Sequence, residues 1–344
     1  MKFLRNTWYC AGWSHDLVDK PLAITLLNEP VVLYRGEDGT AIALEDRCPH
    51  RFAPLSKGKV QGNNIACGYH GLVFDSKGNG THNPHGDGTI PKGCSVKNYP
   101  VIEAQGVIWI WMGEASQADP ASIIDIGECD NREGWTAVHG YLNVKCHYEL
   151  VADNLLDLSH VPYLHSFLSS DGEPPAGFRE ERKVEVEGNT VWSMHWNYNC
   201  PVSPLFSLLW DDAPAIGTLR AHMCWQPPSV LYLDTGFSAE NGTIEDGACF
   251  PGIHLITPET EHSSHYFYAV ARNKKLDDAG LSEGIRIQIN NAFEFEDEPM
   301  VEACHERMPE TDLIALKPVY LPGDVAGMRA RRKLQELIQA ETSA

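Results

Sequence analysis

Short hydrophobic runs alternate with polar and Gly-rich turns along the first third of the chain. An apolar run at 31–35, the turn Gly-Glu-Asp-Gly at 36–39 and a second run at 40–44 predict a β-hairpin. The same alternation returns at 73–80 and in the apolar run 107–112. We therefore expect this part of the chain to be all-β.

The pattern changes after a stretch of small and polar residues at 113–120, which is typical of a linker. We accordingly expect one domain over residues 1–118 and a second over residues 119–344. In the second domain, pieces rich in aromatic and β-branched residues predict a larger sheet, and they lie at 190–196, 230–233 and 265–271.

Helical spacing of apolar residues appears in three stretches, 149–160, 281–303 and 326–341. Pro162 is expected to interrupt the first of these helices, because proline removes a backbone donor and clashes with the preceding turn. The predicted fold class is α+β, with an N-terminal all-β domain followed by a domain that combines an antiparallel sheet with helices.

Composition and charge narrow the class of protein. The 344 residues are 43% hydrophobic and 22% charged, which is typical of a globular protein. The net charge of −20 disfavours nucleic acid and anionic membranes as partners. The apolar runs fall short of the ~18 residues that cross a bilayer, and the N-terminus lacks the features of a signal peptide. We therefore expect a cytoplasmic protein whose ten cysteines are thiols or metal ligands.

Two matched Cys/His pairs carry the most specific chemical signal in the sequence. Cys48-Pro49-His50 is followed, after sixteen residues, by Cys67-Gly68-Tyr69-His70. Zinc also binds two Cys and two His, but its usual spacing keeps like ligands together. One Cys and one His from each loop instead suit a [2Fe–2S] cluster with two thiolates on one iron and two imidazoles on the other. The pattern predicts a Rieske centre, with a structural zinc site as the alternative.

The other cysteines and two nearby histidines receive no metal role. We interpret His82 and His85 as loop histidines. The remaining cysteines lack ligand spacing and are expected to be free thiols: Cys10, Cys94, Cys129, Cys146, Cys200, Cys224, Cys249 and Cys304.

A second constellation follows the linker. Asn154, Asp157 and His160 recur at steps of three residues, which keeps them near one edge of a helix. A break near Pro162 would bring His165 back beside His160, and a carboxylate would then complete a facial triad for Fe(II). Four acids on a predicted helix could supply it, and spacing alone does not choose among them: Glu294, Glu296, Asp297 and Glu298. The alternative is a surface Asp–His pair and a loop histidine.

The two constellations, in this order, resemble the oxygenase component of the Rieske non-haem iron oxygenases over essentially the whole chain. The sequence is most similar to the aromatic O-demethylase branch, which includes vanillate demethylase, dicamba monooxygenase and toluenesulfonate methyl-monooxygenase. Three further stretches carry the resemblance, and they are Arg-Asn-Thr-Trp-Tyr at 5–9, Asn-Leu-Leu-Asp-Leu at 154–158 and Ile-Thr-Pro-Glu-Thr at 256–260. The pair Glu296-Asp297 followed by Glu302-Ala303 also matches, and it implies that Asp297 is the third iron ligand.

The resemblance implies a β-sandwich Rieske domain followed by a helix-grip catalytic domain with an antiparallel sheet, assembled head to tail in a homotrimer. It implies that Asp157 accepts a hydrogen bond from His70 of a neighbouring subunit and orients His160. Asn154 is expected near the iron as a hydrogen-bonding residue rather than a ligand.

The same resemblance implies the terminal oxygenase of a multicomponent monooxygenase, containing a Rieske cluster and mononuclear Fe(II). Electrons from NAD(P)H are expected through a separate reductase or ferredoxin, since this sequence has no Gly-rich nucleotide-binding loop after a strand. The predicted reaction is O₂-dependent O-demethylation of a methoxylated aromatic acid with release of formaldehyde. The alternatives are hydroxylation of a methyl group or ring carbon, a Rieske electron-transfer protein and a zinc-stabilised binding module.

Substrate contacts are predicted more loosely. His254 resembles a residue that grips the anionic group of aromatic acids in relatives, and a satisfied sheet histidine is the alternative. Tyr232, or its neighbour, and Gln288 fall where the dicamba-type pocket has an amide and a large aromatic residue. Leu155 and Leu158 are expected to line the pocket or to pack in the core.

Overall fold

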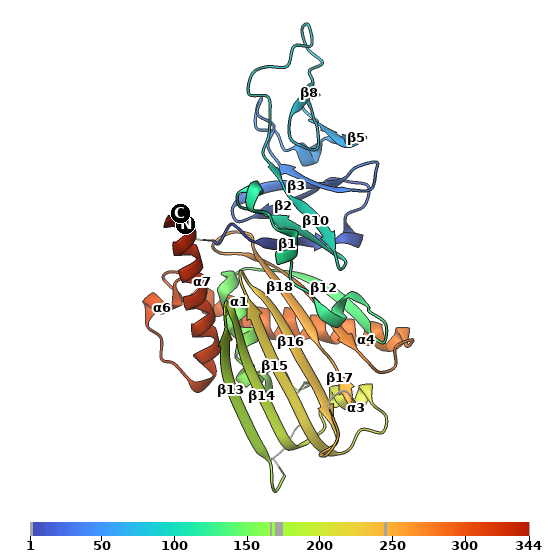
Figure 1. Cartoon of the computed structure of the whole chain (residues 1–344), viewed down its shortest axis with the longest axis vertical. Coiled ribbons are helices and arrows are strands. Elements are labelled where there is room, and N and C mark those ends of the chain that lie inside the picture. Colours follow the sequence, from blue (N-terminus) through green and yellow to red (C-terminus); the bar gives the residue numbers. More distant parts are fainter. Residues whose placement is uncertain (1–2, 166, 169–174, 244–245, 344) are drawn as a thin grey trace. The chain divides into compact units, whose positions relative to one another are not determined.

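The computed structural model describes residues 3–165, 167–168, 175–243 and 246–343. The chain forms two compact units (Figure 1). The first comprises residues 1–125 with 257–260, and the second comprises residues 126–256 with 261–344. Among the helices within the described ranges, none combines the length and apolar character needed to cross a membrane.

The first unit is built from three small antiparallel sheets, as expected for an all-β domain. The first sheet has the order β1-β11-β10, and its strands are β1 (Trp8–Trp13), β10 (Val101–Ala104) and β11 (Val107–Trp111). The second has the order β2-β3-β4-β9, and its strands are β2 (Leu22–Leu26), β3 (Glu29–Arg35), β4 (Ala41–Glu45) and β9 (Asn98–Tyr99). The pairing of β3 with β4 confirms the predicted hairpin, with Val32 opposite Leu44.

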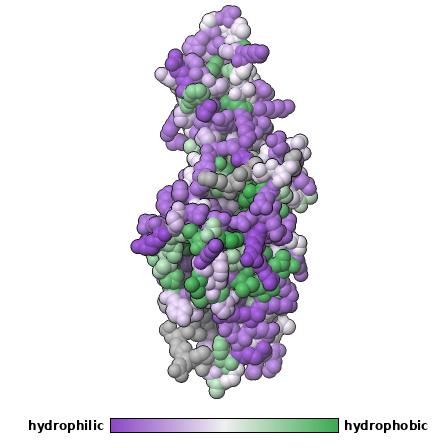
Figure 2. All heavy atoms as spheres, turned by 90° about the vertical axis from the view of Figure 1, so that its left-hand side faces the viewer, coloured by the Kyte–Doolittle hydropathy of each residue, from purple (hydrophilic) through white to green (hydrophobic). Residues whose placement is uncertain are grey.

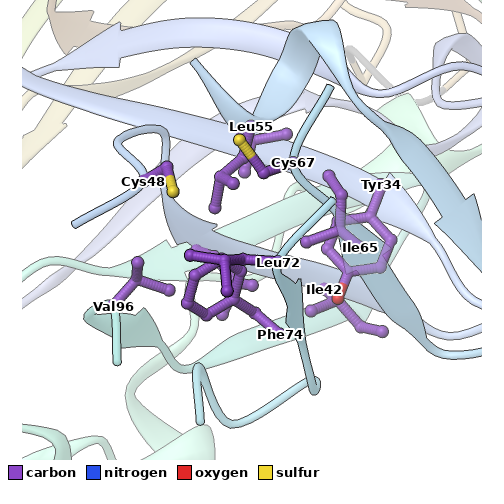
Figure 3. Close-up of a cluster of buried hydrophobic side chains, with 11 residues drawn as sticks. Tyr34, Ile42, Cys48, Leu55, Ile65, Cys67, Leu72, Phe74 and Val96 are labelled. Atoms are coloured by element: carbon purple, nitrogen blue, oxygen red, sulfur yellow. The ribbon is translucent and has the colours of Figure 1, made fainter. Parts of the chain in front are cut away.

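The third sheet of this unit carries the candidate cluster loops. Its order is β5-β6-β7-β8, and its strands are β5 (Lys59–Gln61), β6 (Asn64–Ala66), β7 (Val73–Phe74) and β8 (Gly80–His82). Eleven buried residues form a hydrophobic core beside it. Cys48 and Cys67 project into this core from separate loops (Figure 3), so both candidate thiol ligands lie in an apolar environment.

The second unit is organised around one large antiparallel sheet (Figure 1). Its strand order is β12-β19-β18-β16-β15-β14-β13, and β17 pairs with β16. The strands are β12 (Thr136–Val144), β13 (Arg179–Glu187), β14 (Thr190–Pro201), β15 (Ile216–Gln226), β16 (Val230–Ser238), β17 (Ala248–Cys249), β18 (Gly252–Pro258) and β19 (Ser264–Arg272). The second, larger sheet predicted from the sequence is therefore confirmed.

The helices of this unit largely follow the predicted periodicity. They are α1 (Tyr148–Leu156), α2 (Val161–Leu164), α3 (Pro204–Leu209), α4 (Ala279–Asn291), α5 (Glu298–His305), α6 (Leu313–Leu316) and α7 (Val325–Ser343). The helix expected over 281–303 is interrupted by one wide turn, η7 (Ala292–Asp297), which has π-helical hydrogen bonding. Such insertions are frequent at functional sites, and Asp297 ends this one.

The helix expected over 149–160 is shorter than predicted. It ends at Leu156, because Asp157 leaves the helical conformation with φ −102° and ψ 88°. A short 3₁₀ turn, η6 (Leu158–His160), follows, and α2 then carries Pro162 in its first turn, where proline is tolerated. The first helix therefore ends at Asp157 rather than at the expected break near Pro162, and His165 still lies beside His160 as expected.

Candidate metal centres

The two Cys/His loops of the first unit have the same backbone structure. In each, the cysteine N–H donates to the carbonyl five residues later, and the cysteine carbonyl accepts from the N–H four residues later. The bonds are Cys48 N to Ala53 O (2.9 Å), Phe52 N to Cys48 O (2.9 Å), Cys67 N to Leu72 O (2.7 Å) and Gly71 N to Cys67 O (3.0 Å). The residue four positions after each cysteine has a left-handed backbone, with φ 59° at Phe52 and 75° at Gly71. The repeated geometry presents the two Cys/His pairs as equivalent halves of one site.

The donor set of these loops fits a Rieske cluster. Cys48 and Cys67 are buried, whereas His50 is exposed, and the rings of His50 and His70 lie with centroids 4.4 Å apart. Burial raises the pKa of the Cys48 thiol to about 11, so a metal is needed to hold that group as thiolate. Burial also lowers the pKa of His70, which favours the neutral imidazole that metals bind.

In the second unit, three metal-ligating side chains converge. His160 Nε2 lies 3.2 Å from His165 Nε2, and Asp297 Oδ1 lies 3.5 Å and 3.2 Å from these two nitrogens. Among the residues that the structure describes, this is the one group of three or more His, Cys, Asp or Glu with ligand atoms that close together. Two imidazoles and one carboxylate are the donor set of a facial triad for non-haem Fe(II), so the arrangement fits the expected iron.

Each candidate iron ligand is oriented by a second contact. His160 Nδ1 lies 2.6 Å from the carbonyl of Asp157, and His165 Nδ1 lies 2.7 Å from Glu296 Oε2. Asn154 donates to Asp297 Oδ1 at 3.0 Å. Partners of this kind fix the tautomer and direction of a ligating imidazole. Burial lowers the pKa of His165, but the hydrogen bonds and charges of Asp297 and Glu296 outweigh it and leave that pKa raised.

Asp157 orients His160 through its backbone rather than through the expected carboxylate. Its side chain instead accepts the N–H of Ser159 at 3.0 Å and caps the turn η6. The reason is local, because Asp157 both ends α1 and starts the following turn. The hydrogen bond from His70 of a neighbouring subunit stays a prediction.

Among the predicted substrate contacts, His254 packs against Phe293, which lies in the same turn η7 as Asp297. Its side chain is fully buried on β18, and Nδ1 lies 2.8 Å from the hydroxyl of Tyr266, while Nε2 has no partner among the described residues. Burial lowers the pKa of His254 to about 4, so the ring is neutral near pH 7. Tyr266 also lines a small cavity of about 10 Å³ with Asn154, Phe293 and Asp297.

The register of the sheet separates Tyr232 from His254. His254 pairs with Leu231, so Leu231 and Leu233 share its face and Tyr232 points to the opposite one. The Tyr232 hydroxyl donates to Glu128 at 2.5 Å. The sequence alone does not decide whether Tyr232 or its neighbour lies in the pocket. In the sheet, the neighbours Leu231 and Leu233 lie on the same face as His254, and Tyr232 does not.

The remaining predicted contacts divide between core and surface. Leu155 is buried on α1 and Leu158 is half-buried in η6. Gln288 is exposed on α4, one position before the buried Ile289, so this structure does not bring it to the triad.

The sequence analysis does not predict two partners of the site residues. Glu296 is expected there only as a possible iron ligand, and Tyr266 only as part of a strand, whereas they contact His165 and His254. The signal for Glu296 was its position beside Asp297 in the acidic run 294–298. Only the pairing of strands brings Tyr266 to His254, because these residues lie on the neighbouring strands β19 and β18.

Comparison with known proteins places these two centres in a family. Residues 7–100 match the Rieske [2Fe-2S] domain, and residues 144–340 match the vanillate O-demethylase oxygenase C-terminal domain. The chain belongs to the Rieske non-haem iron oxygenases. It is accordingly an oxidoreductase that uses a Rieske cluster and a mononuclear non-haem iron, as the resemblance in the sequence implied.

Relatives match this oxygenase from end to end. The dicamba O-demethylase oxygenase component of Stenotrophomonas maltophilia is 36% identical and covers 100% of both chains. The chloroacetanilide N-alkylformylase oxygenase component of Rhizorhabdus wittichii is 38% identical over 98% of this chain and 97% of its own. The crystal structure of dicamba monooxygenase bound to 3,6-dichlorosalicylic acid superposes with a TM-score of 0.92 at 35% identity, covering 100% of both chains. The α+β architecture predicted from the sequence is thereby confirmed.

Proposed function

We propose that this oxygenase removes the methyl group of a methoxylated aromatic acid and releases formaldehyde. The observation that carries the proposal is the His160–His165–Asp297 triad, whose Asp297 lines a cavity together with Phe293 and Tyr266. The relatives support it, since their names include dicamba and vanillate O-demethylases.

Two sets of side chains would hold the cofactors. Cys48, His50, Cys67 and His70 would bind the cluster, and the His160–His165–Asp297 triad would bind iron. When bound, the cluster supplies electrons and the iron supplies the site at which O₂ is activated. Asn154 and Glu296 then hold Asp297 and His165 in place by hydrogen bonds. We assign the first task to a domain over residues 1–118 and the second to residues 119–344.

The overall reaction balances with one O₂, two electrons and two protons per methyl group. One oxygen atom enters the C–H bond of the methoxy carbon, and the other leaves as water. The resulting hemiacetal breaks its C–O bond and yields a phenol and formaldehyde. A separate reductase or ferredoxin supplies the electrons from NAD(P)H, in keeping with the designation of the relatives as oxygenase components.

His254 is proposed to bind the polar group of the substrate. Its neutral ring offers one nitrogen, Nε2, that is buried and without a partner among the described residues. A buried polar atom gains most from a hydrogen bond when the ligand supplies the missing partner. Leu155, on α1, would contribute apolar surface for the ring of the substrate.

A homotrimer with head-to-tail contacts is proposed for the assembly. Near the triad, Tyr163 and Phe295 expose 89% and 65% of their surface, and beside the cluster loops Phe52 and Tyr69 each expose 64%. Hydrophobic side chains also gather among polar ones on the face that carries α6 and α7 (Figure 2). Exposed apolar residues beside both centres are suited to burial against a second copy of the chain, in which Asp157 would accept a hydrogen bond from His70 of the partner subunit. The proposed location is cytoplasmic.

The function can be tested without the reductase. The purified protein is reduced chemically under anaerobic conditions and mixed with O₂ and a panel of methoxylated, methylated and N-alkylated aromatic compounds. Formaldehyde with the matching phenol from a methoxylated acid supports the proposal. Oxygenated product without formaldehyde, or dealkylation of the amides alone, would move the enzyme to hydroxylation or N-dealkylation.

A further inference from the structure

Two stripes with the same spacing face each other along α1 and the C-terminal helix. Glu149, Asp153 and Asp157 recur every four residues on and just after α1, so they share one face. Positions 323, 327 and 331 recur every four residues through η8 (Pro322–Asp324) and α7, and they carry Gly, Gly and Arg. The two stripes run in opposite directions, with Gly323 beside Asp157 and Arg331 beside Glu149.

Arg331 binds both acids of α1 in the interior. Its Nη1 donates to Glu149 Oε2 at 2.8 Å, and its Nε donates to Asp153 Oδ2 at 2.8 Å. The Arg331 side chain is 3% exposed, so these contacts are shielded from water. Removing one partner of a buried charge pair leaves an uncompensated charge, which is far more costly than losing a surface pair.

The two glycines allow the helices to approach this closely. A Cβ at position 327 would lie 2.9 Å from Asp153 Oδ1, and one at position 323 would lie 2.3 Å from Asp157 Oδ1. Both distances are shorter than a non-bonded contact allows, so any side chain here would displace the carboxylate. The segment from Gly323 to Arg331 therefore packs closely against the acidic stripe from Asp157 to Glu149.

Residues on and next to the acidic stripe also contact the proposed metal site. Asn154 follows Asp153 directly and donates to Asp297, and the carbonyl of Asp157 accepts from His160. Any rotation or slide of α1 would move both contacts together. Since Arg331 is the one cation that spans Glu149 and Asp153 in the described contacts, it sets the position of α1.

We propose that Arg331 is a positioning residue for the mononuclear iron site, acting through α1. The inference rests on the proposed iron ligands but not on the substrate. Its prediction is that loss of Arg331 weakens iron binding in the second unit and leaves the Rieske cluster of the first unit intact.

The test measures iron retention by the full-length holoenzyme against a ferrous chelator. Arg331→Met is expected to lose the mononuclear iron at least tenfold more readily than the wild type, with the visible spectrum of the cluster unchanged. Arg332→Met, an exposed change on the same helix, serves as the matched control and should behave like the wild type. Wild-type retention by Arg331→Met would overturn the proposal.

A second variant separates the positioning role of Arg331 from its contribution to the stability of the fold. Glu149→Gln, Asp153→Asn and Arg331→Met together remove Arg331 and the two acids that it contacts, so no uncompensated charge remains in this cluster and the melting temperature should recover. Iron retention should stay low, because the Arg331 contacts are still missing; recovery of both would reduce Arg331 to a stabilising residue. If Arg331→Met does not fold, Asp153→Asn provides the same comparison with a smaller expected loss. Unchanged iron content in His165→Ala would instead disprove the iron site itself.

Discussion

At the scale of single residues, the proposed iron ligands are held by hydrogen bonds from their neighbours. Asn154 donates to the same oxygen of Asp297 that faces both imidazoles, so its amide limits how that carboxylate can rotate. Asn154→Ala is expected to weaken iron retention about threefold to tenfold, which corresponds to one net hydrogen bond of ~1 kcal/mol. Competition with a ferrous chelator measures this loss of iron retention.

Gln288 is exposed on α4 and does not face the triad. Gln288→Ala should therefore leave both iron retention and the KM for substrate unchanged. An altered KM would show that Gln288 contacts the substrate.

His147 makes the stability of the second unit sensitive to acid. Burial, followed by the charge of Arg331, lowers the pKa of His147 from 6.5 to about 3. As the pH falls below 6.5, the unfolded chain binds a proton at this residue and the folded chain does not, so stability declines. Between pH 6.5 and pH 5 the loss is about 2 kcal/mol. His147→Gln should flatten the fall of the melting temperature over that range, whereas His82→Gln, exposed on β8, should not; equal slopes in all three proteins would contradict the assignment.

The residues that could be predicted from the sequence are those whose ligand spacing is local. Cys48, His50, Cys67 and His70 lie on two short loops, and His160 and His165 are five positions apart, so spacing alone proposes both centres. Asp297 required the family resemblance, because four acids occur within five positions. The contacts of Glu296 with His165 and of Tyr266 with His254 could not be predicted from the sequence, because they depend on how distant elements pack.

At the scale of elements, periodicity predicted which segments form but not where they change direction. The hairpin of β3 and β4 and the helix α7 follow their patterns closely. The first helix was expected to run to His160, yet Asp157 ends it by leaving helical φ and ψ. The spacing of apolar residues does not show where the backbone leaves the helical conformation. The wide turn η7 was not predicted either, because no Gly or Pro occurs within 292–297 to mark an interruption of the helix.

Two helical glycines give a matched test of the close contact between α1 and α7. A Cβ at Gly284, in α4, meets nothing within 4 Å, whereas one at Gly327 would meet Asp153 at 2.9 Å. Gly284→Ala is expected to leave stability unchanged or raise it by about 0.5–1 kcal/mol through helix propensity. Gly327→Ala should lower the melting temperature despite the same gain in propensity. Equal changes in melting temperature for the two variants would show that the contact between α1 and α7 tolerates a methyl group.

At the scale of the whole molecule, the proposed trimer predicts that subunits share their centres. A Cys48→Ser variant lacks the cluster, and a His165→Ala variant lacks the iron site, so each alone should be inactive. When the two are dissociated and reassembled together, mixed trimers place an intact cluster beside an intact iron site of a neighbour. Formaldehyde release should then reappear at a fraction of the wild-type rate, and a mixture that stays inactive after verified exchange of subunits would contradict the head-to-tail arrangement.

The central claim is that electrons held by the first centre are used at the His160–His165–Asp297 triad to remove a methyl group. The most direct test is a single turnover of the chemically reduced protein with a methoxylated aromatic acid and O₂, in which formaldehyde, phenol and cluster oxidation are quantified together. The wild type should release formaldehyde and phenol in equal amounts while the cluster is oxidised. His165→Ala should retain the cluster spectrum and form neither product. Formaldehyde from His165→Ala, or cluster oxidation in the wild type without any oxygenated product from the whole panel, would contradict the account.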